Sequence, residues 1–363
     1  MIFLDLTKAF DTIDHDVMLN KLLDLGFSDT ALVWFRAYLS NRTQSVRVNG
    51  VLSDPQSIEF GVPQGSLLGP LLFITYINDL PSVVMNCEIQ LYADDTLLFY
   101  SGDSISDIEF HLSQDLNNMI NWLENNFLFL NYAKTKVMLV GTHQRLARVT
   151  NFSITARNKS LDRVYQFKYL GVILDPCLSW NDHIDYIASK ISSRLGMLRK
   201  ARKIIPRASC ITLYDSMVLP LFDYCSAVWS GCGITNREYL NRLQRRAVRI
   251  IEGREVKQND IRSTLNWPSL EARRNYQTCL QVFKCLNGLA PAYLLNKFSL
   301  SRDFHSHNTR NKDLIRLPRA KTSKFQTSFY YNGAKLWNTL PPHIRQENTL
   351  SLFKKNLKKH LSE

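Results

Sequence analysis

Two adjacent aspartates, Asp94 and Asp95, stand between the apolar segments 90–92 and 96–100. Strand-forming residues on both sides of a short polar pair are typical of a tight β-hairpin. Two carboxylates about 4 Å apart repel each other by about 4 kcal/mol at an effective dielectric constant near 20. A bound divalent cation is the usual way to offset that repulsion. Taken alone, the pair fits a solvated turn better than a metal site, so other segments must decide.

The elements that must position these carboxylates follow from the hydrophobic pattern. A short apolar strand at residues 1–6 delivers Asp5, and the sequence predicts a helix that ends near Gly26 and a hairpin turn at Asn49-Gly50. Ser106 and Glu109 resemble a capping box at the start of an amphipathic helix. Strand-like segments at 136–140 and 167–174 follow. Because strands and helices mix without strict βαβ alternation, the predicted fold class is α+β.

Composition limits where the protein works and how many domains it has. The chain has 363 residues, 45% of them hydrophobic, which is enough for two or three domains. It contains no apolar run long enough to span a membrane and no basic segment typical of a signal peptide. Its seven cysteines are scattered and odd in number, which indicates reduced thiols. We therefore expect an intracellular protein of the nucleus or cytoplasm, not a secreted one.

Charge is divided unevenly along the chain. Residues 1–150 hold 9 Lys/Arg and 17 Asp/Glu, a net charge of −8, whereas residues 151–363 hold 36 and 15, a net charge of +21. An acidic N-terminal part and a basic C-terminal part are compatible with metal chemistry in the first and polyanion binding in the second. A solvated basic surface explains the charge alone equally well.

Five short segments occur in a fixed order along the chain: FLDLTKAFD at 3–11, GVPQGSLLGP at 61–70, YADD at 92–95, LFLNYAKTK at 128–136 and FKYLG at 167–171. The first three resemble motifs A, B and C of reverse transcriptases, in the version of non-LTR (LINE-type) retrotransposons. The last two are similar to motifs D and E of that family. Five motifs in the family's order imply an RNA-directed DNA polymerase with a palm domain.

The resemblance implies two-metal nucleotidyl transfer, in which two ions about 3.5–4 Å apart clamp the reacting phosphate. Asp5 and Asp94 would hold two Mg²⁺ ions, or Mn²⁺ in their place, with the Leu6 carbonyl as a further ligand and Asp95 in support. Lys134 would act as the general acid that protonates the leaving pyrophosphate, with Lys136 as the competing candidate.

The resemblance also assigns substrate contacts. Phe10 would be the steric gate that excludes a ribose 2′-hydroxyl, and Pro63, Gln64 and Gly65 would contact the incoming dNTP. Leu170 and Gly171 would form the primer grip. The expected partners are an RNA template, a DNA primer and dNTPs, with no membrane; the sequence does not indicate an oligomeric state.

The predicted organisation is a palm at 1–180, a basic helical thumb-like region at 181–255 and a C-terminal extension at 256–363. In the family, a fingers subdomain and an endonuclease precede motif A, yet Asp5 lies four residues after Met1. We therefore expect an N-terminally truncated polymerase with little activity of its own. The alternative is an inactive nucleic-acid-binding remnant. A nucleotidyl cyclase with a related palm is disfavoured by the segment 61–70 and the basic rear.

Overall fold

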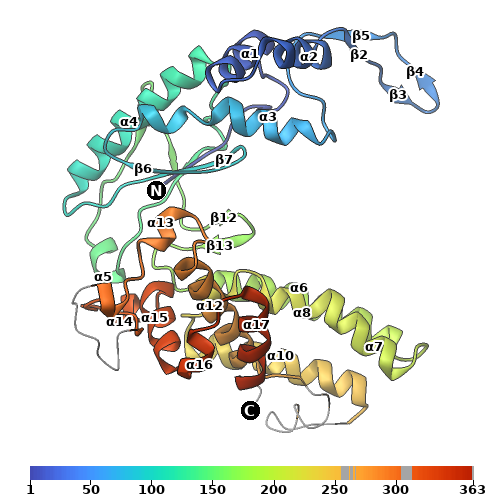
Figure 1. Cartoon of the computed structure of the whole chain (residues 1–363), viewed down its shortest axis with the longest axis vertical. Coiled ribbons are helices and arrows are strands. Elements are labelled where there is room, and N and C mark those ends of the chain that lie inside the picture. Colours follow the sequence, from blue (N-terminus) through green and yellow to red (C-terminus); the bar gives the residue numbers. More distant parts are fainter. Residues whose placement is uncertain (255–260, 262–264, 266, 304–312, 362–363) are drawn as a thin grey trace. The chain divides into compact units, whose positions relative to one another are not determined.

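A computed structural model describes residues 1–254, 261, 265, 267–303 and 313–361. The chain divides into two compact units (Figure 1). Unit 1 comprises residues 1–170 and 175–178, and unit 2 comprises residues 171–174 and 179–363. None of the described helices is both long enough and apolar enough to cross a lipid bilayer.

Unit 1 is built on a five-stranded sheet in the order β11-β8-β1-β7-β6. Its neighbouring strands are antiparallel except for the parallel pair β8 and β11. The strands of this sheet are β1 (Ile2–Leu4), β6 (Glu88–Tyr92), β7 (Asp95–Phe99), β8 (Lys136–Val137) and β11 (Asp162–Arg163). Smaller two-stranded sheets are formed by β2 (Arg42–Gln44) with β5 (Gln56–Ile58), β3 (Arg47–Val48) with β4 (Val51–Leu52), and β9 (Thr155–Ala156) with β10 (Lys159–Ser160). Sheet and helices together make an α+β unit, as the sequence predicts.

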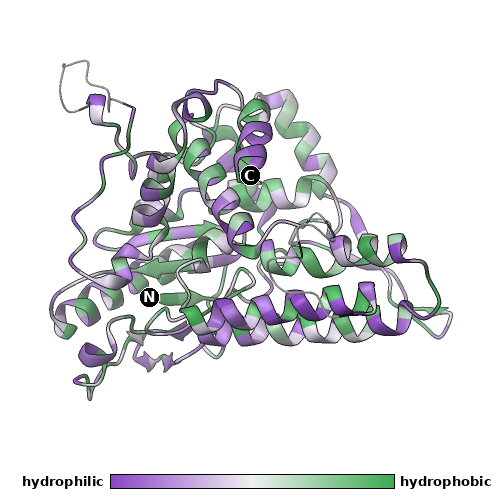
Figure 2. Cartoon of the chain, turned by 90° about the horizontal axis from the view of Figure 1, so that it is seen from below, coloured by the Kyte–Doolittle hydropathy of each residue, from purple (hydrophilic) through white to green (hydrophobic). Residues whose placement is uncertain are grey.

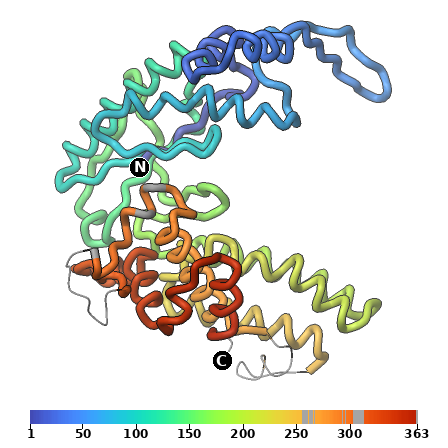
Figure 3. The backbone as a smooth tube through the Cα atoms, in the orientation of Figure 1, coloured from blue at the N-terminus to red at the C-terminus, as the bar shows by residue number. Residues whose placement is uncertain are grey.

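The helices of unit 1 begin at or near the capping residues that the sequence predicts. They are α1 (His15–Asp24), α2 (Asp29–Leu39), α3 (Leu68–Ile77), the 3₁₀ turn η1 (Leu80–Val83), α4 (Ile105–Asn125) and α5 (His143–Leu146). Asp14 caps α1. The predicted capping box at Ser106 is wrong: Ser104 caps α4 by accepting a hydrogen bond from the Asp107 amide, so the helix begins one residue later, at Ile105. The β3–β4 hairpin, which turns at Asn49-Gly50, extends away from the other elements of unit 1 (Figure 3).

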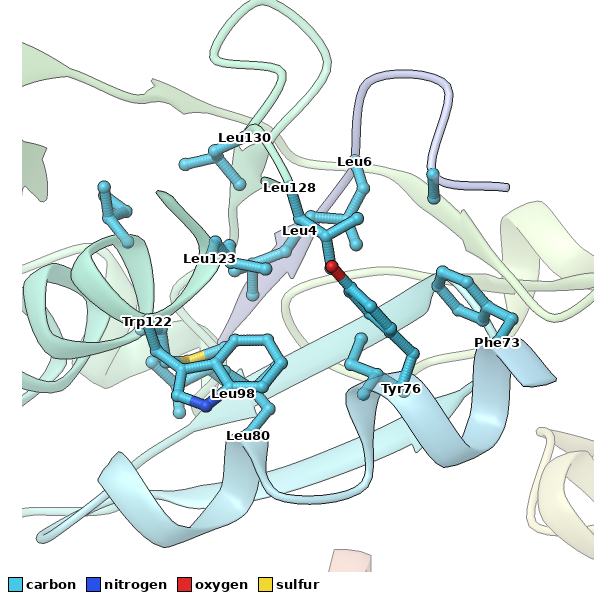
Figure 4. Packing of buried hydrophobic residues seen from close by; sticks show 14 of the residues in the cluster. Leu4, Leu6, Phe73, Tyr76, Leu80, Leu98, Trp122, Leu123, Leu128 and Leu130 are labelled. Carbon is cyan, nitrogen blue, oxygen red and sulfur yellow. The ribbon is translucent and has the colours of Figure 1, made fainter. Parts of the chain in front are cut away.

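The core of unit 1 packs one face of the sheet against α3 and α4. Leu4 and Leu98 of the sheet lie beside Phe73 and Tyr76 of α3 (Figure 4). The buried Tyr76 hydroxyl donates a hydrogen bond to the Asn126 carbonyl at 2.8 Å. The apolar composition of the hairpin segments predicts buried strands, but β6 lies at the sheet edge, and its residues alternate between exposed and half-buried.

Asp115 ties α4 to the segment that leads into β6. Its carboxylate is fully buried and accepts hydrogen bonds from the amides of Asn86 and Cys87, both at 2.7 Å. Burial opposes the charged form, but these hydrogen bonds outweigh it and hold the pKa of Asp115 below its ordinary value. Asp115 therefore fixes where the hairpin of Asp94 and Asp95 starts.

Replacing Asp115 by Asn should destabilise unit 1 by about 2 kcal/mol at neutral pH, because the buried, charged acceptor of two backbone amides is lost. A carboxyl whose pKa is lowered by folding stabilises the protein above its unfolded-state pKa, about 3.9, and ceases to do so as the pH falls through the folded value. The difference between wild type and Asp115→Asn in urea unfolding should therefore shrink on acidification below about pH 4. A difference that stays constant with pH would contradict this account; Asp107→Asn, at an exposed position, is the control.

The described part of unit 2 is mainly helical; it also contains the strand β13 (Val172–Leu174) and an isolated β-bridge between Leu300 and Ile315. Hydrophilic and hydrophobic residues mix along its helices (Figure 2). The described helices are α6 (Asn181–Ala201), α7 (Arg207–Leu213), the π-helical turn η2 (Tyr214–Val218), α8 (Leu219–Asp223), α9 (Ser226–Trp229), α10 (Ile234–Glu252), α12 (Leu270–Leu286), α13 (Ala292–Leu295), the 3₁₀ turn η4 (Ser301–Asp303), α14 (Ser323–Gln326), α15 (Phe329–Thr339), α16 (Pro342–Arg345) and α17 (Leu350–His360). A core cluster joins α12, α15 and α17, where Phe283 stacks on Phe353 at 4.2 Å.

The predicted boundary between a thumb-like region and a C-terminal extension, at residue 255, lies outside the described residues. The three-part division of the chain thus stays a prediction. All seven cysteines lie within the described residues and are free thiols, as their spacing predicts.

Candidate active site

The register of the central strands brings Asp5 to the aspartate hairpin. β1 pairs with β7 so that Leu4 lies opposite Thr96, and continuing this antiparallel register by one residue places Asp5 opposite Asp95. β6 and β7 are joined by the two-residue turn Ala93–Asp94, in which Ala93 has a left-handed φ of 52°. Asp94 is thus the second residue of the turn, and Asp95 is the first residue of β7.

The electrostatics of Asp95 report the same proximity. Partial burial raises the pKa of the Asp95 carboxyl, and the nearby charges of Asp94 and Asp5 raise it further. A carboxyl surrounded by like charges favours the protonated form because ionisation adds repulsion. Three carboxylates from two distant segments of the chain therefore form one negative cluster, and a cation bound there would relieve their repulsion.

The loop at 131–135 fixes Asp5 from the other side of β1. The Asn131 amide donates to the Asp5 carbonyl at 2.8 Å, and the Asp5 amide donates to the hydroxyl of the buried Thr135 at 3.3 Å. The same loop places the ammonium nitrogen of Lys134 4.0 Å from a carboxylate oxygen of Asp5. Lys136 instead pairs with Asp162 at 2.7 Å. Of the two predicted general acids, only Lys134 lies at the carboxylate cluster.

The donor set fits magnesium in its chemistry. Mg²⁺ binds carboxylate oxygens and keeps several waters or substrate phosphates, so it does not require a closed protein cage. Among the described residues, no group of three or more His, Cys, Asp or Glu side chains is arranged as a ready metal site. The metal-ligand roles of Asp5, Asp94 and the Leu6 carbonyl stay a prediction.

The glycine-rich segment at 61–65 packs directly on the loop after Asp5. The Val62 amide donates to the Phe10 carbonyl at 2.9 Å, and the Gly61 amide donates to the Ile13 carbonyl at 2.7 Å. The Gln64 side-chain amide donates to the Asp11 carboxylate at 2.8 Å. These contacts join the segments of motifs A and B, and they hold Gln64 through Asp11.

Gly61 is required at its position for two reasons. Its φ is +84°, a backbone conformation that residues other than glycine rarely adopt. A Cβ there would also lie 2.7 Å from the Asp11 Cα atom. The close contact between the two segments therefore depends on the absence of a side chain. Pro63 is half-buried in the same turn, and Gly65 has a φ of +80°.

The Phe10 ring is half-buried and stacks on Phe73 of α3, with ring centroids 4.5 Å apart. Its role as a steric gate stays a prediction.

Leu170 and Gly171 both have positive φ, 45° and 80°. They lie in the chain between β12 (Phe167–Tyr169) and β13, where the division between the two units falls. Phe167 stacks on Phe3 of β1 at 4.0 Å. The primer-grip role of Leu170 and Gly171 stays a prediction.

Residues 1–174, which contain all of these segments, match the protein family described as "Reverse transcriptase (RNA-dependent DNA polymerase)". The chain belongs to the reverse transcriptase family. Its type is that of non-LTR retrotransposons, as the order of motifs predicts. Reverse transcriptases as a family use divalent metal ions.

Two curated relatives of this reverse transcriptase come from Drosophila melanogaster. One is "Probable RNA-directed DNA polymerase from transposon BS", 31% identical over 263 residues that cover 69% of this chain and 28% of the relative. The other is "RNA-directed DNA polymerase from mobile element jockey", 30% identical over 284 residues that cover 74% and 30%. The chain thus spans less than a third of the length of these two relatives.

A structural comparison adds a likeness to telomerase from Candida albicans, solved with a fragment of telomeric RNA. The likeness covers 98% of this reverse transcriptase and 50% of the telomerase chain at 13% identity. Its TM-score of 0.37 is too low to establish a shared fold.

The sequence did not predict several residues that position this site. Thr135 and Asn131 hold the Asp5 backbone, and His15 lies 2.8 Å through its Nε2 atom from the Gly61 carbonyl. Thr135 could have been found as a buried polar residue before a strand. His15 stands at the start of a capped helix, where the sequence offers no signal for a contact with residue 61.

Proposed function

We propose that this chain carries the catalytic centre of an RNA-directed DNA polymerase that extends a DNA primer on an RNA template with dNTPs. One observation carries the proposal: the β1–β7 register sets Asp5 across from Asp95, with Asp94 in the adjoining turn. Within a reverse transcriptase domain, such convergence of three acidic side chains supports nucleotidyl transfer.

Each residue has a role that its position allows. Asp5 and Asp94, with the Leu6 carbonyl, would hold two Mg²⁺ ions, which supply charge neutralisation at the reacting phosphate. Asp95 keeps the site negative, and its raised pKa is expected to fall when a cation is present. Lys134, exposed and near Asp5, would hold the proton given to the pyrophosphate oxygen. Pro63, Gln64 and Gly65 would border the dNTP, and Leu170 and Gly171 the primer.

Phe10 as the steric gate gives a specific prediction. Phe10→Val should shorten the side chain near the sugar and raise ribonucleotide incorporation relative to deoxyribonucleotide by about a hundredfold, because a steric clash worth about 3 kcal/mol is removed. The measurement is the ratio of single-nucleotide insertion efficiencies for dCTP and CTP. Phe73→Leu is the control, since it alters the packing of the stacked pair but leaves the Phe10 ring in place. An unchanged ratio in active Phe10→Val would contradict the assignment.

A second candidate is an inactive nucleic-acid-binding protein. Residues 48–133 contain no Lys or Arg, so the segment around motifs B and C offers no cationic side chain to a triphosphate. Poor positioning of a substrate is costly for catalysis. Under this candidate the basic residues 151–363 still bind nucleic acid.

The deciding experiment is extension of a labelled DNA primer on an RNA template by the full chain, with Mg²⁺ and with EDTA. The proposed function requires extension that depends on Mg²⁺ and is absent in Asp94→Asn. Binding of the primer–template without any extension, under all metal and dNTP concentrations tried, would favour the inactive candidate.

A further inference from the structure

The Asp11 carboxylate projects from a backbone that is held on both sides. The Phe10 carbonyl before it accepts a hydrogen bond from the Val62 amide at 2.9 Å, and the Ile13 carbonyl after it accepts one from the Gly61 amide at 2.7 Å. A Cβ on Gly61 would lie 2.7 Å from the Asp11 Cα atom, so the two backbones are in direct contact. The base of the Asp11 side chain therefore has little freedom to move relative to the segment of motif B.

Gln64 projects from a turn that is closed by its own hydrogen bonds. The Ser66 hydroxyl donates to the Pro63 carbonyl at 2.7 Å, and the Gly69 amide donates to the Ser66 hydroxyl oxygen at 2.9 Å. The side-chain nitrogen Nε2 of Gln64 donates to the Oδ1 atom of Asp11 at 2.8 Å. Two side chains that start from fixed backbone segments thus meet in one hydrogen bond.

The charge of Asp11 determines which way round the Gln64 amide lies. An ionised carboxylate only accepts hydrogen bonds, whereas a Gln side chain ends in one NH₂ donor group and one acceptor oxygen. The amide must therefore turn its NH₂ group towards Asp11. Its Oε1 atom then points away from Asp11, and no described residue donates a hydrogen bond to it. Both side chains are exposed, so this oxygen is accessible to a ligand.

We propose that Asp11 is a positioning residue, which presents the Oε1 atom of Gln64 to a hydrogen-bond donor on the sugar or base of the incoming nucleotide. An amide turned the other way would set its NH₂ group against that donor and leave both groups unpaired, which is costly once the nucleotide has displaced water. This inference rests on the proposed polymerase function, because Gln64 borders a nucleotide only in that function.

The test measures the affinity of the full chain for a dNTP, with a primer–template whose primer lacks a 3′-hydroxyl. The dNTP can then bind without being incorporated, so the measurement does not depend on chemistry. Asp11→Asn keeps the size of the side chain but offers both a donor and an acceptor, so the Gln64 amide can lie either way round. Because affinity falls with the fraction of correctly oriented molecules, we expect a loss of about three- to tenfold. Asp24→Asn removes an exposed charge at the end of α1 and should bind like wild type.

An exchanged pair distinguishes this role from a structural one. Gln64→Glu alone sets two carboxylates against each other and should weaken dNTP binding by about tenfold or more. In the double variant Asp11→Asn with Gln64→Glu, the amide at position 11 donates to the carboxylate at position 64, whose other oxygen still faces outward as an acceptor. The double variant has the net charge of wild type and should bind dNTP within about threefold of it.

A third background tests whether Asp11 acts through Gln64. Gln64→Met removes the amide, so adding Asp11→Asn to it should not change dNTP affinity further. Both positions are exposed, and the urea midpoint of every variant should stay close to that of wild type.

Two results would overturn the positioning role. One is an equal loss from Asp11→Asn with and without Gln64→Met, and the other is an exchanged pair that binds dNTP as weakly as Gln64→Glu. A parallel extension assay separates this inference from the proposed function. Affinities that follow the expected pattern in a chain that never extends a primer would support the role of Asp11 and refute the polymerase function alone.

Discussion

Asp94→Asn should abolish Mg²⁺-dependent primer extension, with a loss of about a thousandfold or more. Removing one of two carboxylates that hold the ions forfeits several kcal/mol of transition-state stabilisation, and about 4 kcal/mol corresponds to a thousandfold in rate. The matched control is Asp103→Asn, an exposed aspartate eight residues from Asp95 that does not belong to the carboxylate cluster. Activity of Asp94→Asn within tenfold of wild type would refute the assignment.

The same substitution has a consequence that does not depend on catalysis. Without metal, Asp94→Asn removes a charge that raises the pKa of Asp95, so that pKa should move down towards its ordinary value. The metal-free variant should also be at least as stable as wild type, because repulsion is relieved. Added Mg²⁺ should raise the melting temperature of wild type by mass action and leave that of Asp94→Asn unchanged. Equal stabilisation of both proteins by Mg²⁺ would place the metal elsewhere.

Gly61→Ala should destabilise unit 1 by about 3 kcal/mol and disrupt the contact between the loops of motifs A and B. The new methyl group would meet the Asp11 backbone at 2.7 Å, and the backbone would keep a strained φ of +84°. Urea unfolding measures the loss of stability. Extension assays should show a further loss, since Gln64 is held through Asp11.

Gly65→Ala is a matched control for that prediction. Gly65 has nearly the same φ, +80°, but a Cβ there would have nothing within 4 Å. Its variant should therefore lose only the cost of the backbone conformation, about 1 kcal/mol. The difference between the two variants isolates the steric contact with Asp11. Equal losses would show that this contact has no energetic weight.

Local signals in the sequence predicted most of the elements near the site. The apolar pattern around Asp94 and Asp95 predicted the β6–β7 hairpin, and Asn49-Gly50 predicted the turn of the β3–β4 hairpin. Both predictions succeed because turn formation depends on neighbouring residues. The helix start at Ser104 was missed because Ser106 and Glu109 offer a competing capping pattern two residues later. Both serines satisfy the same local rule, and the structure begins the helix after the first of them.

The assembly of the site depends on long-range contacts that the residues alone do not specify. The resemblance to a family was the only ground for predicting that Asp5 and Asp94 converge, since they lie 89 positions apart in the sequence. The structure places Asp5 opposite Asp95, the neighbour of Asp94. The resemblance already favoured Lys134 over Lys136, and the structure adds a reason that the sequence does not contain: Lys136 pairs with Asp162, whereas Lys134 lies 4.0 Å from Asp5. Likewise, the buried Asp115 looks like any polar residue in an amphipathic helix until its two amide partners are known.

The central position of β1 in the sheet has a consequence for how the protein is made. Its partners are β7 and β8, in which Leu97 and Lys136 lie opposite Phe3. Both edges of β1 can therefore be paired only after residue 136 has been synthesised. At about 5–20 residues per second, a ribosome needs about 7 to 26 s to add the 132 residues from Asp5 to Lys136. During that time the apolar strand Ile2–Leu4 leaves the ribosome with open edges, a state prone to pairing with other chains. Folding of the carboxylate site should therefore lag far behind synthesis of Asp5 and depend on chaperones that shield the nascent strand.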